Sequence, residues 1–378
     1  MIYLDHNATT PLLPAAREAM RPWLETHFGN PSSIHAAGRI TRAALDDSRE
    51  NLARLLGTKA HELIFTGGGT ESDNLAILGL ARQHSDRGKH LITAQTEHHA
   101  VLQAFEHLAR HEEFDVTFLP VTTDGLIDPE TLRSAIRSDT TLCSIMAANN
   151  ETGVLQPLSE LSAICRNRGV LLHSDMIQIP GKETVDLSLV DAASFASHKF
   201  NGPTGAGLLY LKAGISIQTL HFGGAHENQR RPGTENVAAV VGMTTAFGNA
   251  LTSQLENSAH EKLLHDLLWE KIDALNGGAK LNGHPEKRVT NTLNVSFPGL
   301  DGEALLIGLD LEGVCVSSGS ACMVGSVLPS HVLLAMGVPE ATAAATVRFS
   351  LGPQNTEAEI EQTVEALSRV LHQARSLE

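Results

Sequence analysis

A lysine and an aspartate each lie just beyond a short apolar stretch of the chain, where a charged side chain is costly to bury. Asp175 follows residues 170–172, and Lys199 follows residues 193–196. A buried carboxylate needs a positive partner, and a protonated pyridine nitrogen that draws electrons from a substrate carbanion is one such partner. A buried lysine becomes partly neutral at pH 7 and can form a Schiff base. Most lysines are solvated surface charges, so this interpretation of Lys199 needs support from its neighbours.

A glycine loop lies upstream, in Thr66-Gly67-Gly68-Gly69-Thr70-Glu71-Ser72. It follows an apolar run and opens a helical segment, where backbone N–H groups and the helix dipole favour an anion such as phosphate. A Walker loop would need a lysine before Ser or Thr, and the Rossmann fingerprint would need a third glycine at Ser72. The loop is therefore compatible with phosphate binding, and equally with a tight strand-to-helix turn.

Two further polar stretches follow apolar runs, Thr96-Glu97-His98-His99 and Asn149-Asn150-Glu151. Taken singly, His98 is more often a structural histidine and Asn150 a turn residue. The adjacent histidines raise the possibility of zinc, but the chain has neither an HExxH motif nor a Cys/His cluster of ligand spacing. No metal is therefore predicted.

A cysteine in a stretch of small residues is the candidate nucleophile. Cys322 ends the stretch Val316-Ser317-Ser318-Gly319-Ser320-Ala321, which has few bulky groups to bury its sulfur. Cys143 and Cys165 fall in an expected strand and an expected helix, so both are predicted to lie in the core. Cys315 is expected to be structural.

The elements that must position these residues follow a regular rhythm. Seven short apolar runs alternate with segments of helical periodicity, which predicts an α/β fold with a mostly parallel seven-stranded sheet flanked by helices. The expected strands are 63–65, 90–93, 116–119, 142–146, 170–173, 193–196 and 207–210, and the expected helices are 72–82, 100–110, 129–137 and 158–168. In such sheets ligands bind beyond the carboxyl ends of the strands, where the polar residues above are expected to meet.

The pattern changes after Gly248. One long amphipathic helix is expected from Gly248 through Leu268, then a strand over 291–297 and a final helix over 356–374. These elements predict a smaller α+β domain. Because the chain exceeds what one hydrophobic core usually supports, we expect a large domain over 12–250 and a small one formed by 1–11 and 251–378.

Composition excludes several classes of protein. The formal net charge is −15 and the longest basic cluster is Gln229-Arg230-Arg231, so no nucleic-acid partner is expected. No apolar run reaches membrane-spanning length, and the first residues lack the features of a signal peptide. The four cysteines form no CxxC pair, which is typical of a reducing cytoplasm, so a cytoplasmic location is expected.

The order of the glycine loop, His98, Asp175 and Lys199 is more specific than any of its parts. In this combination the chain resembles the cysteine desulfurases of the iron–sulfur-cluster and nitrogen-fixation type, class V aminotransferases among the fold-type I pyridoxal-phosphate enzymes. The resemblance runs from Leu4-Asp5-His6-Asn7-Ala8-Thr9-Thr10-Pro11 and Phe28-Gly29-Asn30-Pro31-Ser32-Ser33 to Val347-Arg348-Phe349-Ser350-Leu351-Gly352. It implies a homodimer that removes sulfur from L-cysteine for an acceptor protein such as an iron–sulfur cluster scaffold.

The resemblance also implies a role for each candidate residue around the cofactor, pyridoxal 5'-phosphate. Lys199 would form the Schiff base, Asp175 would pair with the pyridine nitrogen, and Gln178 would hydrogen-bond the phenolic oxygen. His98 would stack on the ring and help to move protons. The phosphate would be held by Gly69, Thr70 and His198, and Thr234 would reach the phosphate of the partner subunit.

Substrate contacts follow from the same resemblance. Asn150 would contact the cofactor and, with Arg348, would fix the substrate carboxylate, which a guanidinium fork matches bidentately. The Cys322 thiolate would attack the substrate sulfur, leaving alanine and a Cys322 persulfide. Small residues around Cys322 would let its loop swing the persulfide toward an acceptor.

Three positions depart from the family pattern, and three alternatives stay open. Ala196 stands where the family commonly has serine, Met176 replaces a small alanine beside Asp175, and Met323 follows Cys322 where Thr or Ser is typical. Within the fold, the alternative is a selenocysteine lyase or another class V lyase. Outside it, a nicotinamide-dependent dehydrogenase lacks its glycine fingerprint, and a catalytically silent sulfur-transfer scaffold would not need Lys199.

Overall fold

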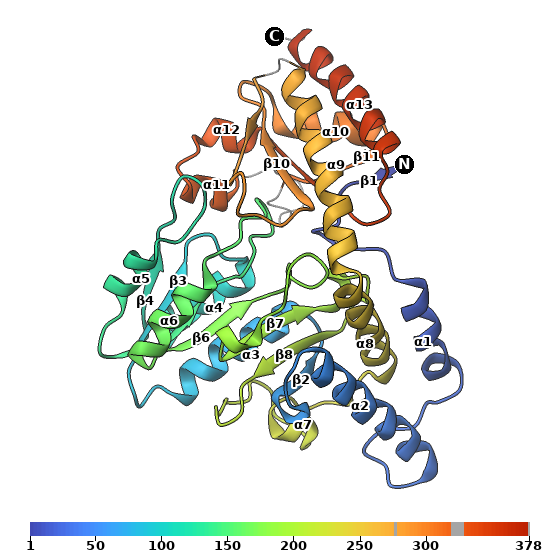
Figure 1. Ribbon diagram of the computed structural model, residues 1–378. Coiled ribbons are helices and arrows are strands. Elements are labelled where there is room, and N and C mark those ends of the chain that lie inside the picture. The colour runs from blue at the N-terminus through green and yellow to red at the C-terminus, as the bar shows by residue number, and fades with distance from the viewer. Residues whose placement is uncertain (276–277, 319–328, 377–378) are drawn as a thin grey trace.

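A seven-stranded sheet forms the centre of the molecule (Figure 1). The computed structural model describes residues 1–275, 278–318 and 329–376. The strand order is β2-β8-β7-β6-β5-β3-β4. The strands are β2 (Leu63–Thr66), β3 (His90–Ala94), β4 (Asp115–Leu119), β5 (Thr140–Ser144), β6 (Leu171–Asp175), β7 (Ala192–Ala196) and β8 (Gly207–Leu211). Neighbours are parallel except for β8, which runs antiparallel to β2 and β7. The predicted mostly parallel sheet is confirmed.

Helices cover both faces of this sheet because its strands are apolar on both sides. Along the strands, Ile64 and Leu91 join one apolar cluster, whereas Phe65 and Ile92 join another. Successive side chains of a strand point to opposite faces, so each cluster lies on one face. The flanking helices are α1 (Pro14–Glu25), α2 (Ala36–Leu55), α3 (Gly69–Gln83), α4 (His99–His111), α5 (Pro129–Ala135), α6 (Leu158–Arg168), α7 (His226–Gln229) and α8 (Val237–Thr252).

The C-terminal part has a separate core. Its three-stranded antiparallel sheet has the order β12-β10-β9. Its elements are α9 (Gln254–Ala274), β9 (Lys280–Leu281), β10 (Thr292–Ser296), α10 (Gly302–Leu311), β11 (Val314–Cys315), α11 (His331–Ala335), α12 (Glu340–Ala344), β12 (Thr346–Ser350) and α13 (Glu357–Ser376). The chain start joins this part, since β1 (Ile2–Tyr3) pairs parallel to β11 and Leu4 lies in the same core. The domain boundaries at residues 11 and 250 stay a prediction.

The single long helix predicted from Gly248 through Leu268 is wrong. The segment forms two helices, α8 and α9, which meet at Ser253 (Figure 1). Ser253 has φ −94° and ψ 3°, outside the helical region. Just before it, the Thr252 hydroxyl donates to the Gly248 carbonyl, a local hydrogen bond of the kind that bends helices. This break lets α8 pack against α1 and α2 of the large part, while α9 continues into the core of the C-terminal part.

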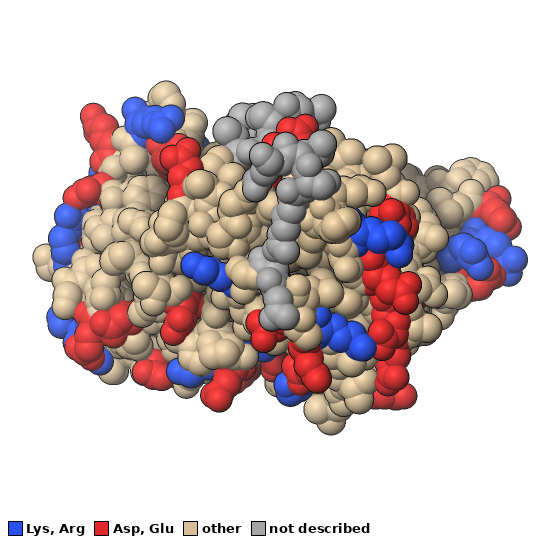
Figure 2. Space-filling view, turned by 90° about the horizontal axis from the view of Figure 1, so that it is seen from above, with Lys and Arg blue, Asp and Glu red and all other residues tan. Residues whose placement is uncertain are grey.

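Charges are mixed on the molecular surface. Figure 2 shows a face on which acidic and basic side chains alternate between larger uncharged areas. Within the described part of the chain, no helix combines the length and the apolar character that crossing a membrane requires.

Candidate active site

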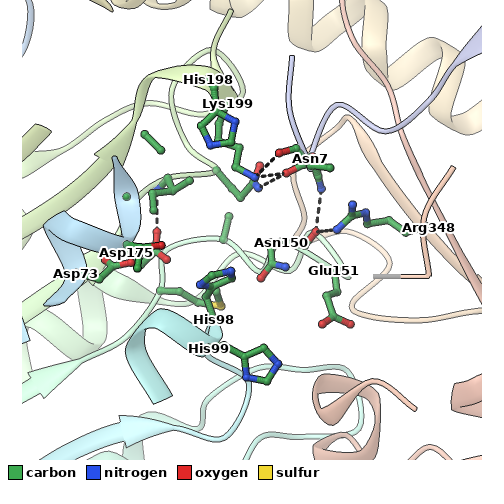
Figure 3. Close-up of a pocket in the computed structure, with 18 of the residues that line it drawn as sticks. Asn7, Asp73, His98, His99, Asn150, Glu151, Asp175, His198, Lys199 and Arg348 are labelled. Carbon is green, nitrogen blue, oxygen red and sulfur yellow. Dashed lines mark hydrogen bonds between the residues drawn. The ribbon is translucent and has the colours of Figure 1, made fainter. Parts of the chain in front are cut away.

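A cavity of about 320 Å³ opens beyond the carboxyl ends of the parallel strands (Figure 3). Its walls come from the large sheet, the N-terminal segment and the C-terminal part. Nine residues predicted from the sequence line it, namely Gly69, Thr70, His98, Asn150, Asp175, Gln178, His198, Lys199 and Arg348. Thr234 is exposed at the surface and is not among these lining residues. Cys322 lies outside the described residues.

Lys199 ends a short 3-10 helix, η3 (Ser197–Lys199), directly after β7. Its Nζ donates to the carbonyl oxygens of Asn7 and Ala8, each 2.7 Å away. The same N-terminal segment is fixed to this loop by Thr10, whose backbone N–H and hydroxyl both donate to the His198 carbonyl. The N-terminal segment therefore holds the lysine amine in the cavity wall (Figure 3).

Asp175 is the last residue of β6 and is buried. Burial raises the pKa of its carboxyl to about 6, although Oδ1 accepts a hydrogen bond from the Ile177 N–H at 2.9 Å. Asp73 lies beside it (Figure 3), and burial together with the Asp175 charge raises the pKa of Asp73 well above its ordinary value. A cationic ligand at this edge of the sheet would stabilise the charged form of the Asp175 carboxyl, which burial disfavours, so the site fits a protonated pyridine ring.

His98 caps the N-terminus of α4. Its Nδ1 accepts a hydrogen bond from the Ala100 N–H at 3.1 Å. Burial, and then the charge of Lys199, lower the pKa of His98 to about 4, so the ring is neutral at pH 7. With Nδ1 engaged as an acceptor, the proton of the neutral ring sits on Nε2. The ring projects into the cavity next to His99 (Figure 3), and the His99 ring contacts that of His331 with centroids 4.6 Å apart.

The glycine loop brings the start of α3 against the loop after β6. The helix begins at Gly69, three residues before the predicted start at Ser72. A Cβ on Gly69 would lie 2.3 Å from the end of the Ile177 side chain, so glycine allows this close approach and any other residue would require Ile177 to move. The first backbone N–H groups of a helix have no partner within it and attract anions. Glu71, the acidic residue in this turn, is paired with Arg231 at 2.6 Å, so its charge is compensated.

Arg348 reaches the cavity from β12 of the C-terminal part and is buried. Its Nη1 donates to the Asn150 carbonyl at 3.0 Å, and its Nη2 donates to Asp5 at 2.7 Å. Within the described part of the chain, its Nε has no hydrogen-bond partner. The guanidinium is therefore fixed in orientation in the cavity wall, where its positive charge suits a carboxylate ligand.

The sequence comparison identifies the family. Residues 2–363 match the model of the aminotransferase class-V family. The chain belongs to the class-V aminotransferase family. It is 43% identical over 378 residues to a "Cysteine desulfurase IscS" of Dictyoglomus turgidum, covering 100% of this chain and 96% of that protein. It is 42% identical over 379 residues to a protein of the same description from Methanosarcina thermophila, covering 100% and 93%.

Solved structures agree with this assignment. A structure described as a NifS-like protein superposes with a TM-score of 0.93 at 35% identity, covering 98% of this chain and 99% of that one. A NifS-like protein from Rickettsia africae gives a TM-score of 0.87 at 32% identity, covering 98% and 99%. Within its family, the chain is a cysteine desulfurase. The predicted fold class and family are confirmed.

Several cavity residues were not predicted from the sequence. Asn7, Asp73 and His331 line the cavity, but none of them follows an apolar run of the kind used to find the other site residues. Asn7 belongs to the small-residue stretch Asn7-Ala8-Thr9-Thr10, and its run of small and mostly polar side chains is the signal that could have found it. Asp73 and His331 lie on helices, where a single polar residue carries no such signal.

Proposed function

We propose that this cysteine desulfurase uses pyridoxal 5'-phosphate to remove sulfur from L-cysteine, giving L-alanine and a persulfide on Cys322. The observation that carries the proposal is that Lys199, Asp175 and His98 face one cavity at the carboxyl ends of the sheet. When bound, the cofactor supplies the electron sink that stabilises the substrate carbanion.

The cavity suits such a cofactor in size and in chemistry. Its volume of about 320 Å³ falls in the range of small-molecule sites, roughly 300–1,000 Å³. Lys199 would hold the cofactor through its amine and Asp175 would face the ring nitrogen. Gly69 and Thr70, at the start of α3, would offer backbone N–H groups to the phosphate.

The side chains of the cavity divide the work on the substrate. Arg348 binds the carboxylate, with Asp5 and Asn150 fixing its guanidinium. His98, neutral with its proton on Nε2, can donate that proton to a reacting group and recover it. Cys322 forms an S–S bond with the substrate sulfur as the C–S bond breaks, and the carbon left behind is protonated to give alanine.

Two variants test this proposal with L-cysteine and a reductant. Cys322→Ala should bind the cofactor, seen as yellow colour that borohydride reduction removes, but should release no sulfide. Lys199→Ala should lose both the reducible colour and at least about 10³-fold of the rate, by analogy with the loss of other nucleophiles. Cys315→Ala and Lys212→Ala are the matched controls and should keep both properties. Undiminished sulfide from Cys322→Ala would remove that cysteine from the mechanism.

A homodimer is the proposed assembly. Phe28, Ile34 and Phe222 are large apolar side chains with exposures of 92%, 91% and 93%. Thr234 is also exposed, as a residue that serves the partner's phosphate must be. Exposed apolar groups of this kind mark protein interfaces. Light scattering should give twice the chain mass, and Phe222→Asp should lower it, whereas a monomeric wild type would contradict the assembly.

The sulfur acceptor and the location are proposed in the same way. An iron–sulfur cluster scaffold protein would take the persulfide sulfur, and the protein would work in the cytoplasm. Cys143, Cys165 and Cys315 are free thiols, as is usual in a reducing compartment. Mass spectrometry of a purified scaffold protein after incubation with enzyme and L-cysteine should show added sulfur, and cell fractionation tests the location.

A further inference from the structure

A second, smaller cavity lies on the far side of Lys199. Its volume is about 70 Å³, and its lining includes Lys199 together with three titratable side chains, His6, Lys182 and Glu261. All three are buried, and they come from the N-terminal segment, the loop after β6 and helix α9. Burying ionisable groups costs free energy unless they have partners, so the contacts of these three side chains decide what they do.

Lys182 makes the most informative contacts. Its Nζ donates to the side-chain oxygen of Gln178 at 2.5 Å and to that of Asn7 at 3.2 Å. Its backbone is anchored to α9, since its carbonyl accepts from the Ser258 hydroxyl at 2.8 Å and from the Gln254 amide at 3.2 Å. The amine is thus a hydrogen-bond donor on a backbone segment that is anchored to α9, four residues after Gln178.

A lysine ammonium can only donate, so it dictates which end of each amide faces it. Gln178 and Asn7 must turn their oxygens toward Lys182 and their NH₂ groups away. The Gln178 NH₂ then donates to the Asn7 carbonyl at 3.1 Å, and the Asn7 NH₂ donates to Thr292 at 2.8 Å. The Asn7 carbonyl is the same atom that accepts from Lys199 at 2.7 Å.

We propose that Lys182 is a positioning residue that fixes Gln178 and Asn7, so that an N–H of Gln178 faces the phenolic oxygen of the cofactor and the Asn7 carbonyl faces Lys199. The proposal rests on the proposed function, because it presumes the cofactor in the front cavity. If Lys182 were absent, the Gln178 amide could turn end for end and present its oxygen, an acceptor, to another acceptor. The contact to the cofactor would then be lost.

Charged neighbours do not make this arrangement a pH switch. Glu261 of α9, His6, Lys199 and Arg348 of β12 surround Lys182. Burial lowers the pKa of Lys182 to about 7 and raises that of Glu261 to about 8. A neutral amine keeps two N–H donors, and the Gln178 and Asn7 amides are held the same way round by hydrogen bonds to the Asn7 carbonyl and from Asn291, so the arrangement persists on either side of neutral pH.

The test is a double-mutant cycle on the holoenzyme. Lys182→Met keeps most of the length of the side chain and removes its donors. We expect the Kd for pyridoxal 5'-phosphate to rise about 10-fold, equivalent to one hydrogen bond. The midpoint of the pH titration of the cofactor's visible absorption should move to higher pH, because the phenolic oxygen loses a donor. In a Gln178→Ala background, Lys182→Met should change the Kd by less than about twofold, since it acts through Gln178.

Several outcomes would overturn the proposal. An unchanged Kd and midpoint in Lys182→Met would do so, as would a full additional 10-fold loss in the Gln178→Ala background. Lys182→Gln keeps an N–H donor, so it should lose less affinity than Lys182→Met, and equal losses would also count against the proposal. If Lys182→Met does not fold, Lys182→Gln completes the cycle in its place. A wild type that binds no cofactor would instead refute the proposed function.

Discussion

The two sides of Lys199 differ in size and in what their buried charges face. The front cavity measures about 320 Å³, and the rear cavity measures about 70 Å³. Burial shifts pKa values on both sides, raising that of Asp175 to about 6 in front and lowering that of Lys182 to about 7 behind. In front these groups face space for ligands, whereas behind they face one another.

This difference separates residues that contact ligands from residues that support them. The rear cavity, at about 70 Å³, lies far below the roughly 300 Å³ at which small-molecule sites begin, so no cofactor fits there. Shifted pKa values by themselves would have marked both cavities as functional sites. From their volumes and hydrogen bonds, we infer that the front cavity binds ligands. The residues around the rear cavity hold the front-cavity side chains in place. Substitutions on the two sides should therefore change different measurements.

The largest effect is expected in front, from Arg348→Lys. The lysine keeps the charge but loses the fork that matches a carboxylate, so the KM for L-cysteine should rise about 10- to 100-fold. Steady-state kinetics of alanine formation measure it. Arg369→Lys is the control, because Arg369 pairs with Glu312 at the surface. An unchanged KM would show that Arg348 does not bind the substrate carboxylate.

A smaller effect on stability is expected behind, from Glu261→Gln. Burial raises the pKa of Glu261 to about 8, so the folded protein retains a proton there that the unfolded chain releases above its ordinary pKa of 4.5. Relative to the variant, the wild type should therefore lose up to about 1.4 kcal/mol of unfolding free energy per pH unit as the pH rises through this window. Urea denaturation measures this, and the KM for L-cysteine should stay the same. Glu256→Gln, at an exposed position of the same helix, is the matched control. If the variant changed the KM for L-cysteine but not the free energy of unfolding, the rear cavity would have a role in substrate binding after all.

At neutral pH, His6→Gln should change the free energy of unfolding least, because the effect of this substitution appears only in acid. Burial lowers the pKa of His6 to about 4, so between pH 6.5 and 4 the unfolded chain binds a proton that the folded protein does not. The wild type should therefore lose up to about 1.4 kcal/mol per pH unit, relative to the variant, as the pH falls through this window. Above pH 7.5 the difference should be constant. A difference that stays constant down to pH 4 would show that His6 is not buried as described.

The residues of the front cavity could be predicted from the sequence far better than those of the rear cavity. Asp175 and Lys199 each lie at or just beyond the end of an apolar strand, and in a parallel sheet those ends meet on one edge. A local pattern therefore sufficed to predict that they converge. Arg348 and Gln178 were assigned only from the family resemblance, since nothing local distinguishes them.

The rear cavity depends on contacts that no local pattern encodes. Asn7 and Lys199 are 192 positions apart in the chain, and Lys182 and Ser258 are 76 apart. The break at Ser253 was also missed, because the sequence on both sides of it favours helix and only a side-chain hydrogen bond interrupts it. Nothing in the local sequence distinguished Lys182 from the other lysines.

The N-terminal segment has a consequence for synthesis on the ribosome. The first strand pairs with Val314 and Cys315, and Asp5 bridges to Ser350. The carbonyl groups that hold the Lys199 amine are therefore translated well before β11 and β12, and the strand pairing that anchors their segment cannot form until those strands have been made. A nascent chain that stops before β12 lacks the pairing of Asp5 with Ser350, so the surroundings of the Lys199 amine are complete only after β12 has been translated.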